Sequence, residues 1–284
     1  MTKRTVLVLG GDKRMIFLAD LFAKEYNSYI CYNESMTPRN AAVINALSEI
    51  SKIDIVILPI PSFDKDGILT GSSNISAEKL FSTIPSNTLI FCAKISDLHR
   101  HLAKEYGHRL LDYGENERFN TYNAIPTAEG AMLIAMQNSE TTIYESNFIV
   151  MGYGRIGKFL SKILRELGGK VTVVSRNDKS LALAECEGLN TMQLNDFCNS
   201  PVCCDICFNT IPSNILTEKE TRKWEFRKYI ELASFPGGLT ETAKNEIKDR
   251  YISALSLPGK YFPTTSGKII YKTIISMISS HGGK

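Results

Sequence analysis

The feature that most constrains the fold is a glycine-rich turn between an apolar run and a helical pattern. Residues 147–151 read as a buried strand, the hexapeptide GYGRIG follows at 152–157, and residues 158–167 have the spacing of a helix. In this context the first glycine permits the tight turn, the second lets a pyrophosphate approach, and the third lets helix and strand pack closely. The motif predicts a dinucleotide-binding Rossmann unit, whose cofactor-binding residues are Gly152, Tyr153, Gly154, Arg155, Ile156 and Gly157.

The end of the next strand indicates which dinucleotide binds. Ser175, Arg176 and Asn177 follow the strand expected at 170–174. An NAD site expects an acidic residue here, about 20 residues beyond the glycines, to bind the ribose 2′-hydroxyl. A hydroxyl and a guanidinium suit a 2′-phosphate better. We therefore predict NADP as the cofactor, with Lys179 as a possible second cation; the alternative is that Arg176 is a solvated surface arginine.

Two further loops are expected at the same edge of the sheet, because each follows a predicted strand. Polar and small residues in them are candidates for the ribose or the nicotinamide, and ordinary turn chemistry explains them equally well. These candidates are Asn209, Thr210, Ile211 and Pro212 in one loop and Ala233 and Ser234 in the other.

Strand and helix patterns alternate in both halves of the chain. This alternation predicts two Rossmann-like, doubly wound parallel-sheet α/β domains with a cleft between them. We expect a substrate-side domain at 1–120, a crossing helix at 121–140, and the NADP-binding Rossmann domain at 141–263. Within the crossing, Thr127 is the expected N-cap of a helix at 128–137. The helix expected at 264–284 should pack back on the first domain.

A second glycine turn opens the chain. Gly10 and Gly11 follow the apolar strand expected at 5–9, and Arg14 comes shortly after them. The motif lacks the third glycine, so a second dinucleotide is not expected. Free amides beside a cation would instead suit an anionic group of a substrate. A capped turn with surface charges is the equally good alternative.

Composition excludes several functional classes. The 284 residues carry a net charge of +3, which argues against a dedicated nucleic-acid binder. No apolar stretch approaches the roughly 20 residues of a membrane span. The seven cysteines form an odd, irregular set, which favours reduced thiols in the cytoplasm, and no metal site is expected.

Several strings carry a resemblance to a known family over nearly the whole chain, in the same order and spacing. The sequence resembles the A subunit of dipicolinate synthase in GGDxR at 10–14, LP at 58–59, YNxIPTxEG at 122–130, GxGRxG at 152–157, NTIPS at 209–213, LASxPGG at 232–238 and LPG at 257–259. The IPTxEG and LASxPGG strings are much more particular than the glycine fingerprint.

The resemblance implies a specific activity. Members of this family act in the mother-cell cytoplasm of sporulating bacteria, together with the flavoprotein-like B subunit of dipicolinate synthase. They convert 4-hydroxy-tetrahydrodipicolinate to dipicolinate through loss of water and a two-electron oxidation by NADP+. The two-domain architecture is similar to that of D-2-hydroxyacid and alanine dehydrogenases. We also expect a homo-oligomer that binds neither nucleic acid nor membranes.

The catalytic and substrate-binding residues are expected in the first domain and the crossing. Glu129 is the candidate base, although it also suits a capping box, and Asn123 could orient substrate or water. Two readings compete with this one: a D-2-hydroxyacid or alanine-type dehydrogenase, and an NADP-binding scaffold without catalysis. The full set of expected substrate contacts is Gly10, Gly11, Arg14, Ser62, Arg118 and Thr127.

Overall fold

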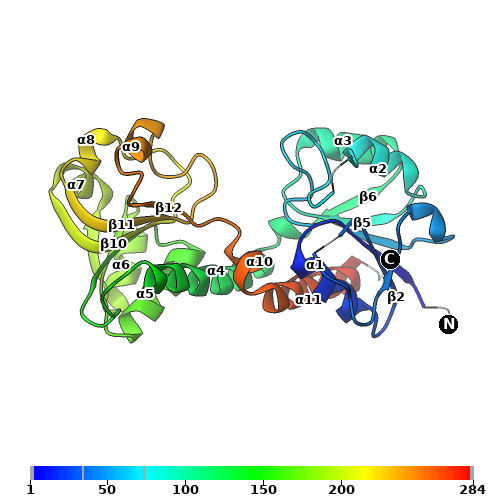
Figure 1. Cartoon of the computed structure of the whole chain (residues 1–284), viewed down its shortest axis with the longest axis horizontal. Helices are drawn as coiled ribbons and strands as arrows, with labels where there is room; N and C mark the ends of the chain where they lie inside the picture. Colours follow the sequence, from blue (N-terminus) through cyan, green and yellow to red (C-terminus); the bar gives the residue numbers. More distant parts are fainter. Residues whose placement is uncertain (1–2, 34, 73, 282–284) are drawn as a thin grey trace. The chain divides into compact units, whose positions relative to one another are not determined.

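A computed structural model describes residues 3–33, 35–72 and 74–281 (Figure 1). The chain divides into two compact units. The first unit is Met1–Asn123 with Pro258–Lys284, and the second unit is Ala124–Leu257. The divisions fall inside helix α4 (Glu117–Gln137) and inside helix α10 (Leu257–Tyr261).

The first unit contains one parallel sheet with the strand order β3-β2-β1-β4-β5-β6. Its strand β1 is buried along its whole length between two apolar clusters, which lie on opposite faces of the sheet. The elements are β1 (Thr5–Leu9), α1 (Lys13–Phe22), β2 (Asn27–Cys31), β3 (Ala42–Val43), η1 (Leu47–Glu49), β4 (Ile55–Ile57), α2 (Ala77–Thr83), β5 (Leu89–Cys92), α3 (Asp97–Glu105), β6 (Arg109–Asp112) and η2 (Tyr113–Glu115).

Helix α11 (Pro263–His281) completes the first unit from the far end of the sequence. It packs against α1, and its Ile270 and Ile274 enter the same apolar cluster as β1 and β4. Gly267 allows the close approach, because a Cβ there would lie 2.7 Å from the backbone oxygen of Arg14. The predicted positions 282–284 of this helix lie outside the described residues.

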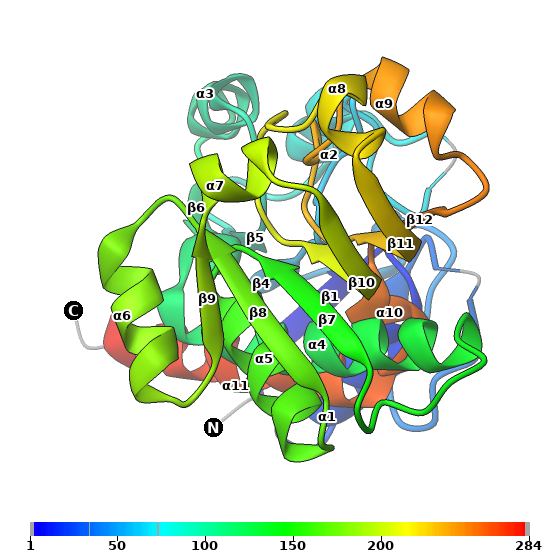
Figure 2. The same cartoon turned by 90° about the vertical axis from the view of Figure 1, so that its left-hand side faces the viewer.

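The second unit contains a parallel sheet with the order β12-β11-β10-β7-β8-β9, whose strands Figure 2 shows side by side. The elements are β7 (Asn147–Met151), α5 (Arg155–Glu166), β8 (Lys170–Ser175), α6 (Asp178–Cys186), β9 (Asn190–Gln193), α7 (Leu194–Asn199), β10 (Val202–Asn209), α8 (Glu218–Thr221), β11 (Trp224–Glu231), α9 (Glu241–Glu246) and β12 (Tyr251–Ser253).

Both sheets have the doubly wound order: successive strands are added from a central first strand toward one edge, and the chain then returns to the centre and adds the remaining strands toward the other edge. Ligands of such sheets bind outside the carboxyl ends of the strands at this switch point. In the first unit the switch point lies between β1 and β4, and in the second unit between β7 and β10. The predicted fold class of two Rossmann-like parallel sheets is confirmed; the cleft between them stays a prediction.

The segment before residue 127 differs from the prediction. The helix expected at 128–137 begins earlier, because η2 and the first half of α4 occupy most of 113–126. Asn116 explains the earlier start, because its side-chain oxygen accepts the N–H of Phe119 at 3.1 Å and so caps the helix. Thr127 therefore lies inside α4, and its prediction as an N-cap is wrong.

Truncation of Ile274 tests the packing of α11. Ile274 is fully buried, so Ile274→Ala should lower the free energy of unfolding by about 2–5 kcal/mol. The matched control is Leu183→Ala on α6, where the side chain is 40% exposed and the loss should stay below about 1 kcal/mol. Urea unfolding followed by circular dichroism measures both, and equal losses would contradict the packing described above.

Candidate functional site

The glycine turn of the second unit lies at its switch point. Gly152 has a φ of +91°, which favours glycine, and its N–H donates to Val174 at 2.8 Å. A Cβ on Gly157 would lie 2.1 Å from the carbonyl oxygen of Gly152, so only glycine lets α5 approach β7 this closely. A Cβ on Gly154, in contrast, would meet nothing within 4 Å. The turn is thus tightly packed on one side and open at its middle glycine.

The open side of this turn is the N-terminus of α5. Gly154 is the N-cap and has no side chain to cap the helix, and the bond from Lys158 N to Gly154 O is the first of the helical ladder. The preceding amides of the first turn lack intrahelical partners and carry the positive end of the helix dipole. The residues present therefore fit a pyrophosphate, as the sequence predicts.

Tyr153 contributes to this turn in a different way from its neighbours. Its ring is buried, and its hydroxyl donates to Glu187 at 2.9 Å beyond the end of α6. Burial raises the pKa of this hydroxyl, and the bond to Glu187 raises it further. The side chain is therefore part of the packing between α5 and α6, and only the backbone of Tyr153 is available to a ligand.

Thr210 joins the carboxyl ends of β10 and β7 across the switch point. Its N–H and its hydroxyl both donate to Met151 O, at 2.9 and 2.8 Å. A Cβ on Gly152 would lie only 2.4 Å from this hydroxyl, so the Thr210 side chain occupies the space that a larger residue would need. The loop that continues through Ile211 and Pro212 is thereby fixed beside the glycine turn, and its contact with a cofactor stays a prediction.

Asn209 and Glu231 form a buried pair at the same edge. The Asn209 amide donates to the Glu231 carboxylate at 2.7 Å, and neither side chain is more than 2% exposed. Asn209 is thus covered and cannot contact a ligand directly. The loop after Glu231 places Ala233 and Ser234 at this edge, with Ala233 buried and Ser234 exposed.

The residues predicted to select the 2′-phosphate follow β8. The Ser175 hydroxyl accepts the N–H of Asn177 at 3.1 Å, and Asn177 caps α6 by accepting Ser180 N at 3.1 Å. Arg176 is exposed between them. The nearest acid along the chain, Asp178, is hydrogen-bonded to Gln193 instead. An exposed guanidinium is therefore presented where the 2′ position of the ribose is expected.

The glycine turn of the first unit is filled by its own chain. Gly10 N donates to Cys31 O at 2.9 Å, and Gly11 N donates to Thr70 O at 2.6 Å. Gly71 packs so closely that a Cβ on it would lie 2.3 Å from Gly11 N. The prediction of free amides at Gly10 and Gly11 is wrong, because both amides are hydrogen-bonded within the chain. This agrees with the alternative of a capped turn.

Arg14 is also engaged within the first unit. Its Nε donates to the Asp12 carboxylate at 2.9 Å, and its Nη2 donates to Ile60 O at 3.2 Å. Gly259 packs on this pair, because a Cβ there would lie 2.9 Å from Arg14 Nε. The structure therefore contradicts the expected substrate contact of Arg14, since its guanidinium is bonded to Asp12 and to the segment after β4 and is covered by Gly259 of α10.

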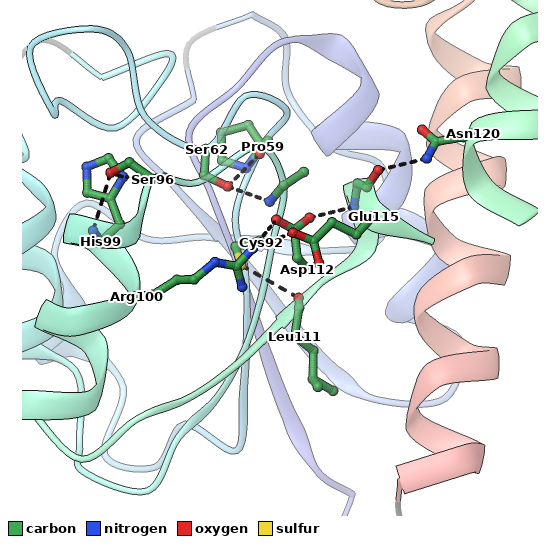
Figure 3. Close-up of polar contacts among 12 residues, drawn as sticks. Pro59, Ser62, Cys92, Ser96, His99, Arg100, Leu111, Asp112, Glu115 and Asn120 are labelled. Atoms are coloured by element: carbon green, nitrogen blue, oxygen red, sulfur yellow. Dashed lines mark hydrogen bonds and ion pairs between the residues drawn. The ribbon is translucent and has the colours of Figure 1, made fainter. Parts of the chain in front are cut away.

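Ser62 is buried and holds two strand ends together (Figure 3). Its hydroxyl donates to Pro59 O at 2.9 Å and accepts the N–H of Ala93 at 2.8 Å. No side of this side chain is exposed, so the prediction that it contacts substrate is wrong. Its role is to join the segments after β4 and β5.

Two cations at the carboxyl edge of the first unit gave no signal in the sequence. Arg100 binds Asp112 at 3.3 Å and Glu115 at 2.6 Å (Figure 3). Burial raises the pKa of Asp112, and Glu115 adds to the rise while Arg100 opposes it. Lys94, which follows β5, is exposed and has a φ of +53°, an uncommon conformation outside glycine. A single lysine after a strand belongs to no sequence motif that predicts a binding role.

Helix α4 carries the remaining candidates. Glu129 is exposed, Asn123 is half-buried and Thr127 is buried. Arg118 is exposed and its guanidinium lies 5.7 Å from the centre of the Tyr122 ring. Within the described residues these four lie on one continuous helix, and their proposed contacts with substrate stay predictions.

Two kinds of feature are absent from the described ranges. No helix there is long and apolar enough to cross a membrane. In the same part of the chain, no group of three or more His, Cys, Asp and Glu side chains could hold a metal ion.

Known protein structures share the architecture of the two units. An L-alanine dehydrogenase covers 98% of this chain and 90% of its own, with 11% identity and a TM-score of 0.65. A D-lactate dehydrogenase from Treponema pallidum covers 99% and 98%, with 11% identity and a TM-score of 0.59. The predicted similarity to alanine and D-2-hydroxyacid dehydrogenases is confirmed for the fold.

Closer relatives carry one shared name. The A subunit of dipicolinate synthase from Bacillus subtilis (strain 168) is 27% identical over 288 residues, which are 98% of this chain and 97% of that protein. A crystal structure of the dipicolinate synthase A chain from Bacillus subtilis has a TM-score of 0.82 and 26% identity, covering 99% and 97%. The crystal structure of the Bacillus halodurans A subunit of dipicolinate synthase has a TM-score of 0.86 and 23% identity, covering 98% of both chains.

Family models match each unit separately. Residues 5–114 match the N-terminal domain of the dipicolinate synthase A subunit, and residues 148–199, which contain the glycine turn, match the TrkA-N domain. With the relatives that align over nearly its whole length, these matches confirm the resemblance drawn from the sequence: along nearly its whole length the chain is similar to the A subunits of dipicolinate synthase.

Proposed function

We propose that this chain is an NADP-dependent oxidoreductase that forms dipicolinate. One observation carries the proposal. At the switch point of the second unit, the glycine turn leaves open space at Gly154 before the N-terminus of α5, whereas the chain fills the corresponding turn of the first unit. A dinucleotide pyrophosphate fits the open turn by size and charge. The shared name of the relatives, dipicolinate synthase, supplies the product.

NADP is proposed over NAD on the chemistry at the end of β8. The exposed Arg176 can form a bidentate, charge-assisted contact with a 2′-phosphate. A carboxylate in that place would repel the phosphate, and Asp178 is already hydrogen-bonded to Gln193. Both arguments favour the phosphorylated ribose.

The proposed substrate is 4-hydroxy-tetrahydrodipicolinate, which loses its 4-hydroxyl as water to give dihydrodipicolinate. Removal of two electrons and two protons would then give the aromatic ring; NADP+ held by the glycine turn and Arg176 would supply the acceptor for both electrons and one of these protons. Aromatisation supplies driving force, so the residues of the chain mainly position the ring and accept the remaining proton. Glu129 is the proposed base and Asn123 the proposed orienting group.

The two carboxylates of such a substrate need cations or N–H donors. Arg14 and Arg100 are unsuitable because carboxylates of the first unit already bind them. Arg118 and Lys94 are exposed and are the proposed contacts of these carboxylates. The proposed function also includes a partner, the flavoprotein-like B subunit. We further propose a homo-oligomeric state and a location in the mother cell of a sporulating bacterium.

A pair of glycine substitutions tests the open turn. Gly154→Ala should leave thermal stability unchanged, because the new Cβ meets no protein atom, and should weaken NADP+ binding at least about ten-fold by obstructing the pyrophosphate. Gly157→Ala is the contrasting control and should cost about 1–3 kcal/mol of stability, because its Cβ meets the Gly152 carbonyl. Calorimetry gives both quantities. Unchanged NADP+ affinity in Gly154→Ala would show that the pyrophosphate lies elsewhere.

Arg176→Ala tests the choice of cofactor. Loss of a charged contact worth about 1.5–3 kcal/mol should weaken NADP+ binding roughly 10- to 100-fold and leave NAD+ binding within about two-fold. The control is Lys170→Ala, at the opposite end of β8, which should change neither affinity. Titration calorimetry compares the two dinucleotides. An equal loss for NADP+ and NAD+ in Arg176→Ala argues against the 2′-phosphate assignment.

Turnover with and without the B subunit tests catalysis by this chain. With NADP+ and freshly generated 4-hydroxy-tetrahydrodipicolinate, the isolated chain should form NADPH and dipicolinate in equal amounts, followed by absorbance and chromatography. Turnover that requires the second polypeptide, despite NADP+ binding here, would favour a scaffold role. Oxidation of a 2-hydroxyacid or of alanine by NADP+ would favour the competing dehydrogenase reading.

A further inference from the structure

A buried carboxylate at the end of β11 holds both ends of the loop that follows it. Glu231 is 2% exposed, and its Oε1 accepts the N–H of Ala233 at 3.0 Å. Its Oε2 accepts the N–H of Gly238 at 2.8 Å. The segment 232–238 is therefore fastened at its start and its end to one side chain. Between these points it carries Phe235, which is 90% exposed.

The same carboxylate reaches the neighbouring loop through Asn209. The Asn209 Nδ2 donates to Glu231 and also to Ile211 O at 2.9 Å, while its Oδ1 accepts Ile211 N at 3.0 Å. Asn209 is fully buried and lies at the end of β10. Glu231 thus fixes 209–212 and 232–238 together, and these are the two segments predicted to contact the cofactor beyond the glycine turn.

Close packing leaves this arrangement little freedom. A Cβ on Gly237 would lie 2.9 Å from Glu231 Oε2, and a Cβ on Gly238 would lie 2.5 Å from Asn209 Nδ2. The hydroxyl of Tyr229 is buried beside them, and a Cβ on Gly238 would lie 2.6 Å from it. Among the described residues this hydroxyl has no hydrogen-bond partner. A side chain at either glycine would therefore displace the Asn209–Glu231 pair.

Burying this carboxylate carries an electrostatic cost. Burial raises the pKa of Glu231, and the N–H donors of Gly238, Asn209 and Ala233, with Lys244 on α9, offset only part of the rise. The other titratable groups that face it are Cys207 on β10, Tyr229 on β11 and Tyr251 on β12, and all three have raised pKa values. An acid with a raised pKa in the folded state destabilises the fold once it is ionised.

We infer that Glu231 is a positioning residue, whose carboxylate fixes the loops after β10 and β11 for the nicotinamide half of the dinucleotide. The inference rests on the proposed function. The adenosine half lies, on that proposal, at the glycine turn and Arg176, which Glu231 does not contact. A defect at Glu231 should therefore affect binding of the whole dinucleotide and spare binding of its adenosine 2′-phosphate part.

The experiment compares Glu231→Gln with Glu246→Gln, the same change at a surface ion pair with Arg222 in the same unit. Glutamine offers one acceptor oxygen in place of two. Its NH2 group would therefore face an N–H donor of Asn209, Ala233 or Gly238. Glu231→Gln should weaken NADP+ at least about ten-fold and leave adenosine 2′,5′-bisphosphate within about two-fold. Glu246→Gln should change neither affinity. Titration calorimetry supplies both constants.

Amide hydrogen exchange gives a readout that needs no ligand. The amides of Ala233 and Gly238 should exchange roughly ten-fold faster in Glu231→Gln, while those of β7 and β10 stay protected. As pH rises through the raised pKa of Glu231, the wild-type chain should lose stability relative to Glu231→Gln, because only the wild type must then bury a charge. This difference in melting temperature checks that the carboxylate ionises in the folded chain.

The outcomes separate this inference from the proposed function. Released amides with unchanged NADP+ affinity would overturn the positioning role and leave NADP binding intact. Equal weakening of NADP+ and adenosine 2′,5′-bisphosphate would also overturn it, since the defect would then be general. A wild-type chain that binds neither ligand would refute the proposed function and the inference together, and a wild-type chain that binds both keeps the two questions apart.

Discussion

The second unit depends on the contact between Gly157 and the carbonyl of Gly152. Because no Cβ separates them, α5 begins directly against the end of β7 and its first amides face outward at the carboxyl edge of the sheet. The hydroxyl of Thr210 fills the remaining space behind Gly152 and bonds the end of β7. A side chain at either glycine would push the helix away, and the anion site would be lost with it.

The two units show that the same topology serves different purposes. Both sheets have the doubly wound order, and both have glycines after the first strand. In the first unit, Thr70 and Gly71 occupy the space before that turn, and Asp12 with Arg14 neutralises the start of α1. Of these two turns, the one in the second unit leaves room for a ligand. The function therefore follows from the site and not from the fold.

The sequence predicts interactions between residues that are close in the chain better than interactions between distant segments. The turn at 152–157 follows from local rules, because strand, glycines and helix are adjacent in the chain. The bonds that close the turn at Gly10 and Gly11 come from Cys31 and Thr70, which no local pattern connects to them. The prediction for Ser62 is wrong for the same reason, since its partner Ala93 follows another strand. Glu231 gave no signal at all, because an acid at a strand end is ordinary until its burial is known.

The central claim is that a dinucleotide lies on the second unit with its pyrophosphate at the glycine turn and its ribose 2′-phosphate at Arg176. A crystal structure of the chain with NADP+ tests this most directly. We expect pyrophosphate oxygens within hydrogen-bond distance of the first amides of α5, and the 2′-phosphate in contact with the Arg176 guanidinium. A dinucleotide bound at the turn of the first unit, or with its 2′-phosphate in solvent away from Arg176, would contradict it.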